Sequence, residues 1–388
     1  MAPQADPLAA ANALAPEIRE RLAEIESGRR LPLPLVHAFR RAGVFRLLFP
    51  QSCQGIEADP ATLVEVLHAI SRVDGSAGWC AMIGATSGVT LAYLPPETAR
   101  EVSGGGEAIL GGVLHPRGRA ILAGDDYRAT GRWPFASGCE HTDWLLGGCL
   151  VFGEDGTKPL LRADGTPEAR SMLFSRHDVE IHDTWSVAGL RGTGSHDMSV
   201  RDVAVPRARS VRFATDPVRE SGPLYAFPIF NLLSLGIAAV ALGIARGAID
   251  DFREIARAKV ATGSRRVMAE RGATQSEVAR AEALVESSRD HLLARIDAAW
   301  RGVLAGRTID VAERAHIRLA ATHAVRSAAD AVDRMYEAAG GGAVYESGPL
   351  ARRFRDVHVA TQHVMVGAST YELAGRVLLG LETDTELL

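Results

Sequence analysis

Asp183-Thr-Trp-Ser-Val-Ala-Gly-Leu-Arg-Gly-Thr-Gly-Ser-His-Asp197 is the stretch that decides how the middle of this chain is interpreted. It is rich in glycine and runs into Met198 to Pro206, which alternates as a strand does and stops at a proline. A Rossmann phosphate loop must instead lead into the N-terminus of a helix. The segment therefore predicts a turn in a β-rich region and excludes a Rossmann phosphate loop here.

The composition of the whole chain is typical of a large globular protein. Its 388 residues are 47% hydrophobic and 23% charged, which is enough apolar material for two or three domains. The formal net charge of −4 gives no support for binding to nucleic acid or to an anionic membrane surface. Residues 1–7 lack the basic-then-apolar order of a signal peptide, so we expect a cytoplasmic protein.

The longest apolar run, Ile229 to Ala245, is interrupted by Asn231 and Ser234 and is short for a membrane span. It predicts a helix that is buried on all sides. The four cysteines form no Cys-x-x-Cys pair, so we expect small buried side chains and no metal site. The sequence has no Gly-x-Ser-x-Gly, Walker or His-Glu-x-x-His motif, which argues against the common hydrolases, phosphotransferases and zinc proteases.

The spacing of apolar residues changes twice along the chain. Helical spacing in the first part predicts helices at 8–27, 34–42 and 61–72, and another from residue 74. Period-two runs then predict short strands, including 144–152, 171–181 and a hairpin near 125–133. Long helices are expected at 230–258, 274–301, 310–339 and 352–379.

This order predicts an α+β fold that is mainly α. We expect an N-terminal helical domain over 1–107, a central β-barrel or sandwich domain over 108–215 and a C-terminal four-helix bundle over 216–388.

The loop from Trp133 to Asp143 lies between two expected strands and is a candidate binding site. It contains the aromatic residues Trp133 and Phe135, the hydroxyl of Ser137 and the flexible Gly138. A strained loop of this kind can present backbone N–H groups, a hydroxyl and an aromatic face to a flat ring. An ordinary polar turn has the same composition, so the motif alone leaves both interpretations open.

Two further candidates lie near the C-terminus. His358 and His363 are five residues apart, or about 140° around a helix, so they cannot hold a metal from one face. We expect one of them to face the bundle and the other to face elsewhere, and a helical histidine is more often structural or solvated than catalytic. Gly340-Gly-Gly342 could let the backbone approach a phosphate or ribose, or it could simply end a helix.

Four motifs in this order resemble those of flavoproteins with the acyl-CoA dehydrogenase fold. More closely, the chain is similar to the two-component flavin-dependent monooxygenases of that fold, over nearly its whole length. The resemblance rests on these segments: Ser71 to Trp79, Gly131 to Cys139, Trp185 to Ser195 and Arg355 to His363. Each motif is weak alone, and their order and spacing are specific for the fold more than for the reaction.

The resemblance implies an oxygenase component that receives reduced FMN or FAD from a separate NAD(P)H:flavin reductase. Oxygen would add to the flavin as a C4a-hydroperoxide and hydroxylate a small aromatic substrate. An acyl-CoA dehydrogenase or oxidase with bound FAD is the alternative. Many dehydrogenases carry a catalytic Glu where this chain has His363 and Val364, and the next Glu is Glu372. Other dehydrogenases place the base elsewhere, so the departure does not decide between the two.

The same resemblance assigns roles to individual residues. Catalysis would use His363 as a proton donor or acceptor and Ser137 near flavin N5. The flavin would contact these residues: Trp133, Phe135, Ser137, Gly138, Arg191 and, from a second subunit of a homotetramer, Gly340, Gly341 and Gly342. The substrate pocket would include Trp79, His141 and His358, and whether His358 or His363 faces the flavin stays open. A non-catalytic helical scaffold with a β insert would explain the helices but not the loop from Trp133 to Gly138.

Overall fold

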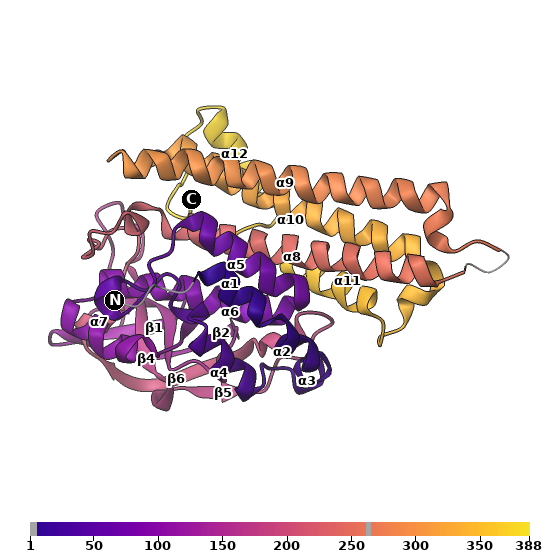
Figure 1. Cartoon of the computed structure of the whole chain (residues 1–388). Helices are drawn as coiled ribbons and strands as arrows, with labels where there is room; N and C mark the ends of the chain where they lie inside the picture. The colour runs from indigo at the N-terminus through magenta and orange to yellow at the C-terminus, as the bar shows by residue number, and fades with distance from the viewer. Residues whose placement is uncertain (1–5, 261–264) are drawn as a thin grey trace.

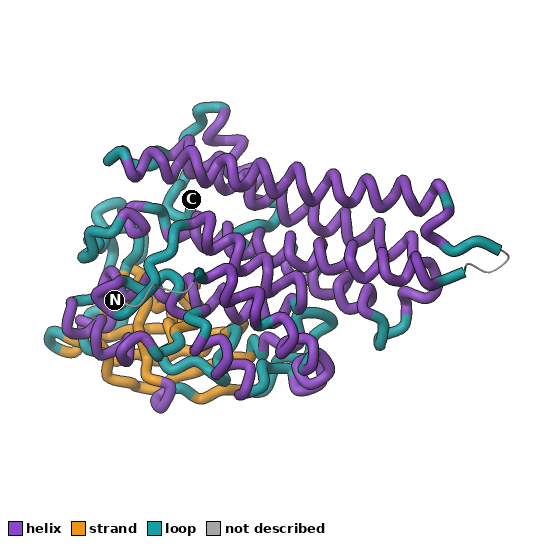
Figure 2. The backbone as a smooth tube through the Cα atoms, viewed as in Figure 1, coloured by secondary structure: helices purple, strands orange, loops and turns teal. Residues whose placement is uncertain are grey.

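The computed structural model describes residues 6–260 and 265–388. The strands gather at one side of the molecule with the N-terminal helices around them, and the long C-terminal helices run together across the other side (Figure 1). The same division is visible when the backbone is coloured by secondary structure (Figure 2). One cluster of buried apolar side chains joins the N-terminal helices to the long helices, and a second fills the interior of the sheet.

Seven α-helices lie in the described residues of the N-terminal part, from residue 6 onward. They are α1 (Pro7–Ala13), α2 (Ala15–Glu20), α3 (Leu22–Gly28), α4 (Leu33–Arg41), α5 (Pro60–Val73), α6 (Gly75–Ser87) and α7 (Pro96–Ser103). The single helix expected over 8–27 is wrong, because the chain breaks at Leu14 and Arg21. Pro16 lacks a backbone N–H and stands in the first turn of α2, which accounts for the first break.

α5 and α6 meet at Asp74, which is extended and ends one helix while it begins the next. Its Oδ1 accepts the backbone N–H of Ala77 at 2.7 Å and so caps α6. The apolar stripe expected on α5 is buried, including Leu63 and Ile70. Asp74 also belongs to a buried ionic cluster beside the glycine-rich segment.

The strands form one seven-stranded sheet in the order β5-β6-β2-β1-β3-β4-β7. They are β1 (Leu110–Ala123), β2 (Asp126–Ala136), β3 (Trp144–Phe152), β4 (Ala169–Ser175), β5 (Glu180–His182), β6 (His196–Val205) and β7 (Ser210–Val211). β1 and β2 form the expected hairpin, and β1 pairs with β3 in parallel. The single strand expected over 171–181 is wrong, because a 3-10 turn at Arg176–Asp178 divides it into β4 and β5.

In the C-terminal part, the residues on either side of 261–264 form three long helices and two short ones. They are α8 (Ile229–Ala258), α9 (Gly272–Leu304), α10 (Val311–Ala339), α11 (Pro349–Ala360) and α12 (Ser369–Leu378). α8 is long and apolar enough to cross a membrane by length and composition, but 89% of its most apolar window is buried inside the protein. The expectation of a helix buried on all sides is therefore confirmed. α8 contacts α5, α6, α10 and α11.

The fourth long helix expected over 352–379 is wrong. The chain leaves the α-helix after Ala360 and turns through residues 361–368 before α12 begins. Backbone N–H groups in this break bond to the carbonyl three residues back, as His363 does to Ala360 at 3.3 Å. The hydroxyl of Thr361 also donates to the carbonyl of His358 at 2.7 Å. His363 consequently lies in a tight turn and not on a helix.

All four cysteines are free and buried, which confirms their expected role as small core side chains.

Candidate active site

A chain of buried hydroxyl groups joins α6 to the loop after β2 and to the glycine-rich segment. The indole Nε1–H of Trp79 donates to Ser137 Oγ at 3.1 Å. Ser137 Oγ lies 2.7 Å from Ser195 Oγ, which lies 2.7 Å from Thr193 Oγ1. Thr193 Oγ1 donates to the carbonyl of Leu190 at 2.8 Å.

Each hydroxyl has one hydrogen to donate, so the bond from Thr193 to the Leu190 carbonyl fixes the direction of the other hydrogen bonds in this series of hydroxyls. Thr193 uses its hydrogen on the Leu190 carbonyl, so it accepts from Ser195. Ser195 in turn accepts from Ser137. Ser137 therefore donates to Ser195 and accepts from Trp79, and one lone pair of its oxygen is left for a ligand.

The backbone around Ser137 is strained. Phe135 has a φ of 67°, which is rare outside glycine, and its side chain is 67% exposed. Its ring meets that of Trp185 edge-on, with the centroids 6.1 Å apart. Gly138 has a φ of 72°, and a Cβ there would lie 2.9 Å from Nε2 of His141. An exposed aromatic ring and a polarised hydroxyl thus share one rigid loop.

His363 reaches the same place from the break between α11 and α12. Its ring and that of Trp79 have centroids 5.8 Å apart. Its Nδ1 accepts the backbone N–H of Met365 at 3.2 Å. Burial, reinforced by the charge of Arg318, lowers the pKa of His363 to about 4. The imidazole is therefore neutral near pH 7 and carries its proton on Nε2.

The structure thus brings Ser137, Trp79 and His363 together. His141 lies behind this group, half-buried beneath Gly138, with its ring centroid 6.0 Å from that of Phe45. Burial lowers its pKa to about 4.

Two of the expected site residues lie elsewhere. Trp133 is 0% exposed, donates its Nε1–H to the carbonyl of Gly148 at 2.7 Å and packs against Phe174. It is a core residue of the sheet, so the expected contact with a flavin is wrong. His358 bonds through Nε2 to Asp333 at 2.7 Å and packs on Phe354. Neither contact supports the expected place of His358 in the substrate pocket, whereas His363 packs against Trp79, the hydrogen-bond partner of Ser137.

The glycine-rich segment is held in place by a buried ionic cluster, which we define as Glu26, Asp74, Arg352 and Asp356. Arg352 pairs with Asp74, Asp356 and Glu26. Oδ1 of Asp356 accepts the backbone N–H of Leu190 at 2.6 Å. Burial raises the pKa of Asp356 to about 7. The cluster therefore ties α3, α6 and α11 to the loop that ends the hydroxyl chain.

Arg191, which the sequence assigned to the flavin, joins the edge of this cluster. Its Nε lies 3.6 Å from a carboxylate oxygen of Glu26 and within 3.5 Å of that residue's carbonyl. Sequence reasoning missed Asp74 and Asp356. The one available signal was that each stands in a quoted motif directly beside a glycine or an arginine.

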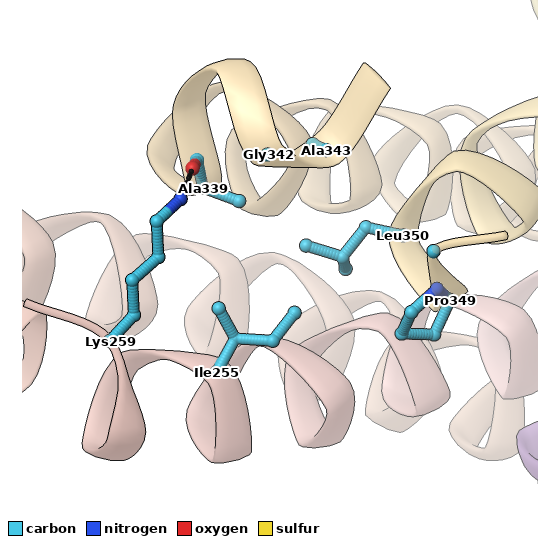
Figure 3. A pocket seen from close by; sticks show the side chains of 8 residues that line it. Ile255, Lys259, Ala339, Gly342, Ala343, Pro349 and Leu350 are labelled. Atoms are coloured by element: carbon cyan, nitrogen blue, oxygen red, sulfur yellow. Dashed lines mark hydrogen bonds between the residues drawn. The ribbon is translucent and has the colours of Figure 1, made fainter. Parts of the chain in front are cut away.

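Gly340, Gly341 and Gly342 lie in a 3-10 segment between α10 and α11. Gly342 lines a cavity of about 260 Å³ together with Ile255, Lys259 and Leu350 (Figure 3). Nζ of Lys259 donates to the carbonyl of Ala339 at 2.9 Å (Figure 3). Among the described residues, no hydrogen bond or ring contact joins this segment to Ser137 or His363 within one chain.

The chain shares its fold and much of its sequence with known flavoproteins. Residues 235–368 match the family described as acyl-CoA dehydrogenase, C-terminal domain. The indole-3-acetate monooxygenase of Pseudomonas putida is 34% identical over 93% of this chain and 90% of its own length. The flavin-dependent monooxygenase oxygenase subunit HsaA of Mycobacterium tuberculosis is 32% identical over 92% of this chain and 90% of its own length.

Solved structures agree. The crystal structure of the M. tuberculosis HsaA monooxygenase matches with a TM-score of 0.90 and 29% identity over 99% of both chains. The structure of XiaF from Streptomyces in complex with FADH2 and glycerol matches with a TM-score of 0.88 and 27% identity, over 97% of this chain and 96% of XiaF. The chain therefore belongs to the flavin-dependent monooxygenases of the acyl-CoA dehydrogenase fold, as the oxygenase component of a two-component system with a separate flavin reductase.

Proposed function

We propose that this monooxygenase hydroxylates a small aromatic substrate, with the flavin ring between the Ser137 loop and His363. The observation that carries the placement is the directed hydroxyl chain, which leaves one acceptor lone pair on Ser137. Reduced flavin carries a hydrogen on N5 and can donate to that oxygen, whereas N5 of oxidised flavin can only accept. The chain of hydroxyls therefore favours the reduced cofactor.

The residues around Ser137 fit such a cofactor. The exposed ring of Phe135 offers a flat apolar surface, and the buried indole of Trp79 excludes water from the region between Ser137 and His363. The bound flavin supplies the activation of oxygen. His363, neutral with a hydrogen on Nε2, donates a hydrogen bond into the pocket and can pass that proton to a departing oxygen.

An aromatic substrate is supported by the activities for which the relatives are named. Besides the indole-3-acetate monooxygenase, a FADH(2)-dependent resorcinol hydroxylase oxygenase component of Rhizobium is 30% identical over 94% of this chain. The acyl-CoA dehydrogenase alternative loses support from the position of Glu372, which is exposed on α12 and so lacks the buried setting of a base for an acyl thioester.

We also propose a homotetramer in the cytoplasm. A neighbouring subunit would bring Gly340 to Gly342 to the tail of the flavin, which accounts for a glycine-rich segment and a cavity that do not reach Ser137 within one chain. A cytoplasmic location fits the need for reduced flavin made with NAD(P)H in the same compartment. Either FMN or FAD would serve the chemistry at Ser137 and His363.

Anaerobic titration with reduced and oxidised forms of FMN and FAD tests the proposal. We expect tighter binding of the reduced form, and oxygen consumption only when a reductase or chemical reductant is present. A tightly held oxidised FAD that an acyl-CoA bleaches under anaerobic conditions would support the dehydrogenase instead. If neither the reduced nor the oxidised flavin binds at micromolar concentration, the protein does not use a flavin and the proposal is wrong.

A further inference from the structure

The carbonyl of Leu190 ends the hydroxyl chain and accepts from more than one donor. Besides the hydroxyl of Thr193, it accepts the backbone N–H of the same residue at 3.2 Å and the indole Nε1–H of Trp185 at 3.1 Å. The ring of Trp185 in turn meets the exposed ring of Phe135 edge-on. The direction of this one carbonyl therefore affects both the hydroxyl of Ser137 and the aromatic ring beside it.

Leu190 holds the carbonyl in place with a conformation that leucine rarely adopts. Its φ is 51° and its ψ is 35°, in the left-handed region that is unfavourable for a residue with a Cβ. Such a conformation persists only where the surrounding structure enforces it. The backbone N–H of Leu190 donates to the buried carboxyl group of Asp356 at 2.6 Å, across 166 positions of sequence. This bond is one contact that enforces the conformation.

Two neighbouring residues of α11 fix the segment that leads to Leu190. Nε of Arg355 donates to the carbonyl of Ala188 at 2.8 Å, and Asp356 accepts from Leu190 two positions further on. Between these bonds Gly189 lies so close to α11 that a Cβ would fall 2.3 Å from the carbonyl oxygen of Arg355. The left-handed residue is thus placed from outside its own loop, by a side chain of another element.

The direction of the hydroxyl chain decides which oxidation state of a flavin suits Ser137. While Thr193 donates to the Leu190 carbonyl, every hydroxyl of the chain donates towards that end. Ser137 then offers a lone pair, which suits the N5–H of reduced flavin. If the carbonyl turned away, Thr193 could donate to Ser195, and Ser195 to Ser137. The hydrogen of Ser137 would then be free for N5 of oxidised flavin, which can only accept.

We propose that Asp356 is a positioning residue that, through the carbonyl of Leu190, makes the site select reduced flavin over oxidised flavin. This inference rests on the proposed function and adds to it the residue that sets the preference. Asp356 acts through Leu190 and Thr193 and takes no part in the transfer of oxygen. A site with this preference releases oxidised flavin after turnover and takes up reduced flavin in its place.

The test measures the ratio of the affinities for reduced and oxidised flavin. Anaerobic titration with FMN or FAD, whichever binds more tightly, gives both affinities. The midpoint potential of the bound flavin reports the same ratio independently, because a tenfold change in it equals about 30 mV for a two-electron couple.

Two substitutions of Asp356 separate the hydrogen bond from the charge. Asp356→Ala leaves the Leu190 N–H without its acceptor. We expect its preference for reduced flavin to fall about tenfold and the midpoint potential to fall by about 30 mV. Asp356→Asn keeps an oxygen that can accept from this N–H and should retain the preference. An equal loss in the two variants would overturn the inference, because the charge of Asp356 would then matter and its bond to Leu190 would not.

Thr193→Val tests the same route if the alanine variant does not fold. It has the shape of threonine without the hydroxyl, so the bond to Leu190 is lost and Ser195 is free to donate to Ser137. We expect the affinity for oxidised flavin to rise and the preference for reduced flavin to fall about tenfold. The control is Thr90→Val, since the hydroxyl of Thr90 is buried and has no hydrogen-bond partner among the described residues. It should keep the full preference.

A double-mutant cycle shows whether Asp356 acts through Ser137. Ser137→Ala removes the hydroxyl whose direction is at issue, so the addition of Asp356→Ala should lower the preference no further. Losses that add in the double variant would overturn the inference, as would a wild-type preference that survives in Asp356→Ala or Thr193→Val. The proposed function would stand after any of these results. It fails, and the inference with it, only if the wild-type protein itself shows no preference for reduced flavin.

Discussion

Trp79 and Ser137 are joined by a hydrogen bond of 3.1 Å between the indole Nε1–H and the serine Oγ, although 58 residues separate them. The bond fixes a hydroxyl of the β2 loop against α6, and the indole also packs on His363. One side chain thus sets the relative positions of the two groups that the mechanism uses. Its burial lets it do so without admitting water.

Removal of the Ser137 hydroxyl should weaken the binding of reduced flavin. Ser137→Ala leaves the Trp79 Nε1–H without its acceptor and ends the hydroxyl chain at Ser195. We expect affinity for reduced flavin to fall about tenfold, since a buried donor loses its partner, and affinity for oxidised flavin to change less. Anaerobic titration measures both. Ser186→Ala, an exposed hydroxyl of the neighbouring segment, is the control, and equal behaviour of the two variants would contradict the placement.

The two histidines near the C-terminus should behave differently. His363→Ala should keep the fold and the affinity for reduced flavin, but it should release hydrogen peroxide in place of hydroxylated product, because the pocket loses its neutral N–H donor. The measurement is the ratio of product to oxygen consumed. His358→Ala removes the contacts with Asp333 and Phe354, neither of which involves Ser137 or Trp79, and should keep that ratio. Unchanged coupling in His363→Ala would remove this residue from the site.

The glycine-rich segment should tolerate no side chain at Gly189. A Cβ there would lie 2.3 Å from the carbonyl oxygen of Arg355, a backbone atom of α11 that cannot move alone. We expect Gly189→Ala to lower the free energy of unfolding by about 1–3 kcal/mol, as overpacking does. Urea unfolding checks this. Gly375→Ala on α12 meets nothing within 4 Å and should leave stability unchanged or raise it. An unchanged free energy of unfolding in Gly189→Ala would mean that α11 does not pack closely against the segment.

Stability should fall as the pH drops from 6.5 towards 4. Burial lowers the pKa of His68, His141 and His363 to about 4, so in this window the unfolded chain binds more protons than the folded one. Asp356 opposes them with one proton, because its pKa is raised to about 7. Three histidines outweigh one carboxyl group, and the free energy of unfolding therefore decreases on acidification.

His68 lies outside the active site and isolates this effect. Its Nε2 is buried without a partner in the described part of the chain. His68→Gln should reduce the loss of stability between pH 7 and pH 5, by an amount that cannot exceed about 3 kcal/mol for a shift of this size. Urea unfolding of both proteins at the two pH values gives the difference. Equal losses in variant and wild type would mean that His68 is not held neutral by the fold.

Strong local signals were sufficient for much of the fold. The β3 strand (Trp144–Phe152) matches its expected bounds, because an apolar run there lies between Asp143 and Gly153. α10 begins after Asp310, whose side chain forms a capping box with Glu313, and it ends before Gly340. A few neighbouring residues determine each of these boundaries.

The wrong predictions fall at places where contacts between residues far apart in the sequence determine the local structure. The break after Ala360 has no proline, and its apolar residues continue a helical pattern. The turn is held by hydrogen bonds three residues apart and by the bond between Thr322 and Thr370. Trp133 and Phe135 are two residues apart on one strand, yet one is in the core and the other is exposed, because the positive φ of Phe135 changes the alternation. Local pattern carries no information on either event.

The partnership of Ser137 and His363 could be expected only from resemblance, since 226 positions separate the two in sequence. The structure adds the side chain that joins them, Trp79, and the direction of each hydrogen bond. The burial of Arg318, whose charge helps to lower the pKa of His363, had no sequence signal, because an arginine on a long helix is normally solvated.

Incorporation of labelled oxygen tests the central claim most directly. The reduced-flavin complex is mixed with ¹⁸O₂ and a panel of small aromatic compounds that includes indole-3-acetate and resorcinol, and products are analysed by mass spectrometry. We predict a hydroxylated product that carries one ¹⁸O atom, together with oxidised flavin. Complete conversion of the oxygen to hydrogen peroxide with every compound, or a product whose added oxygen comes from water, would contradict the account.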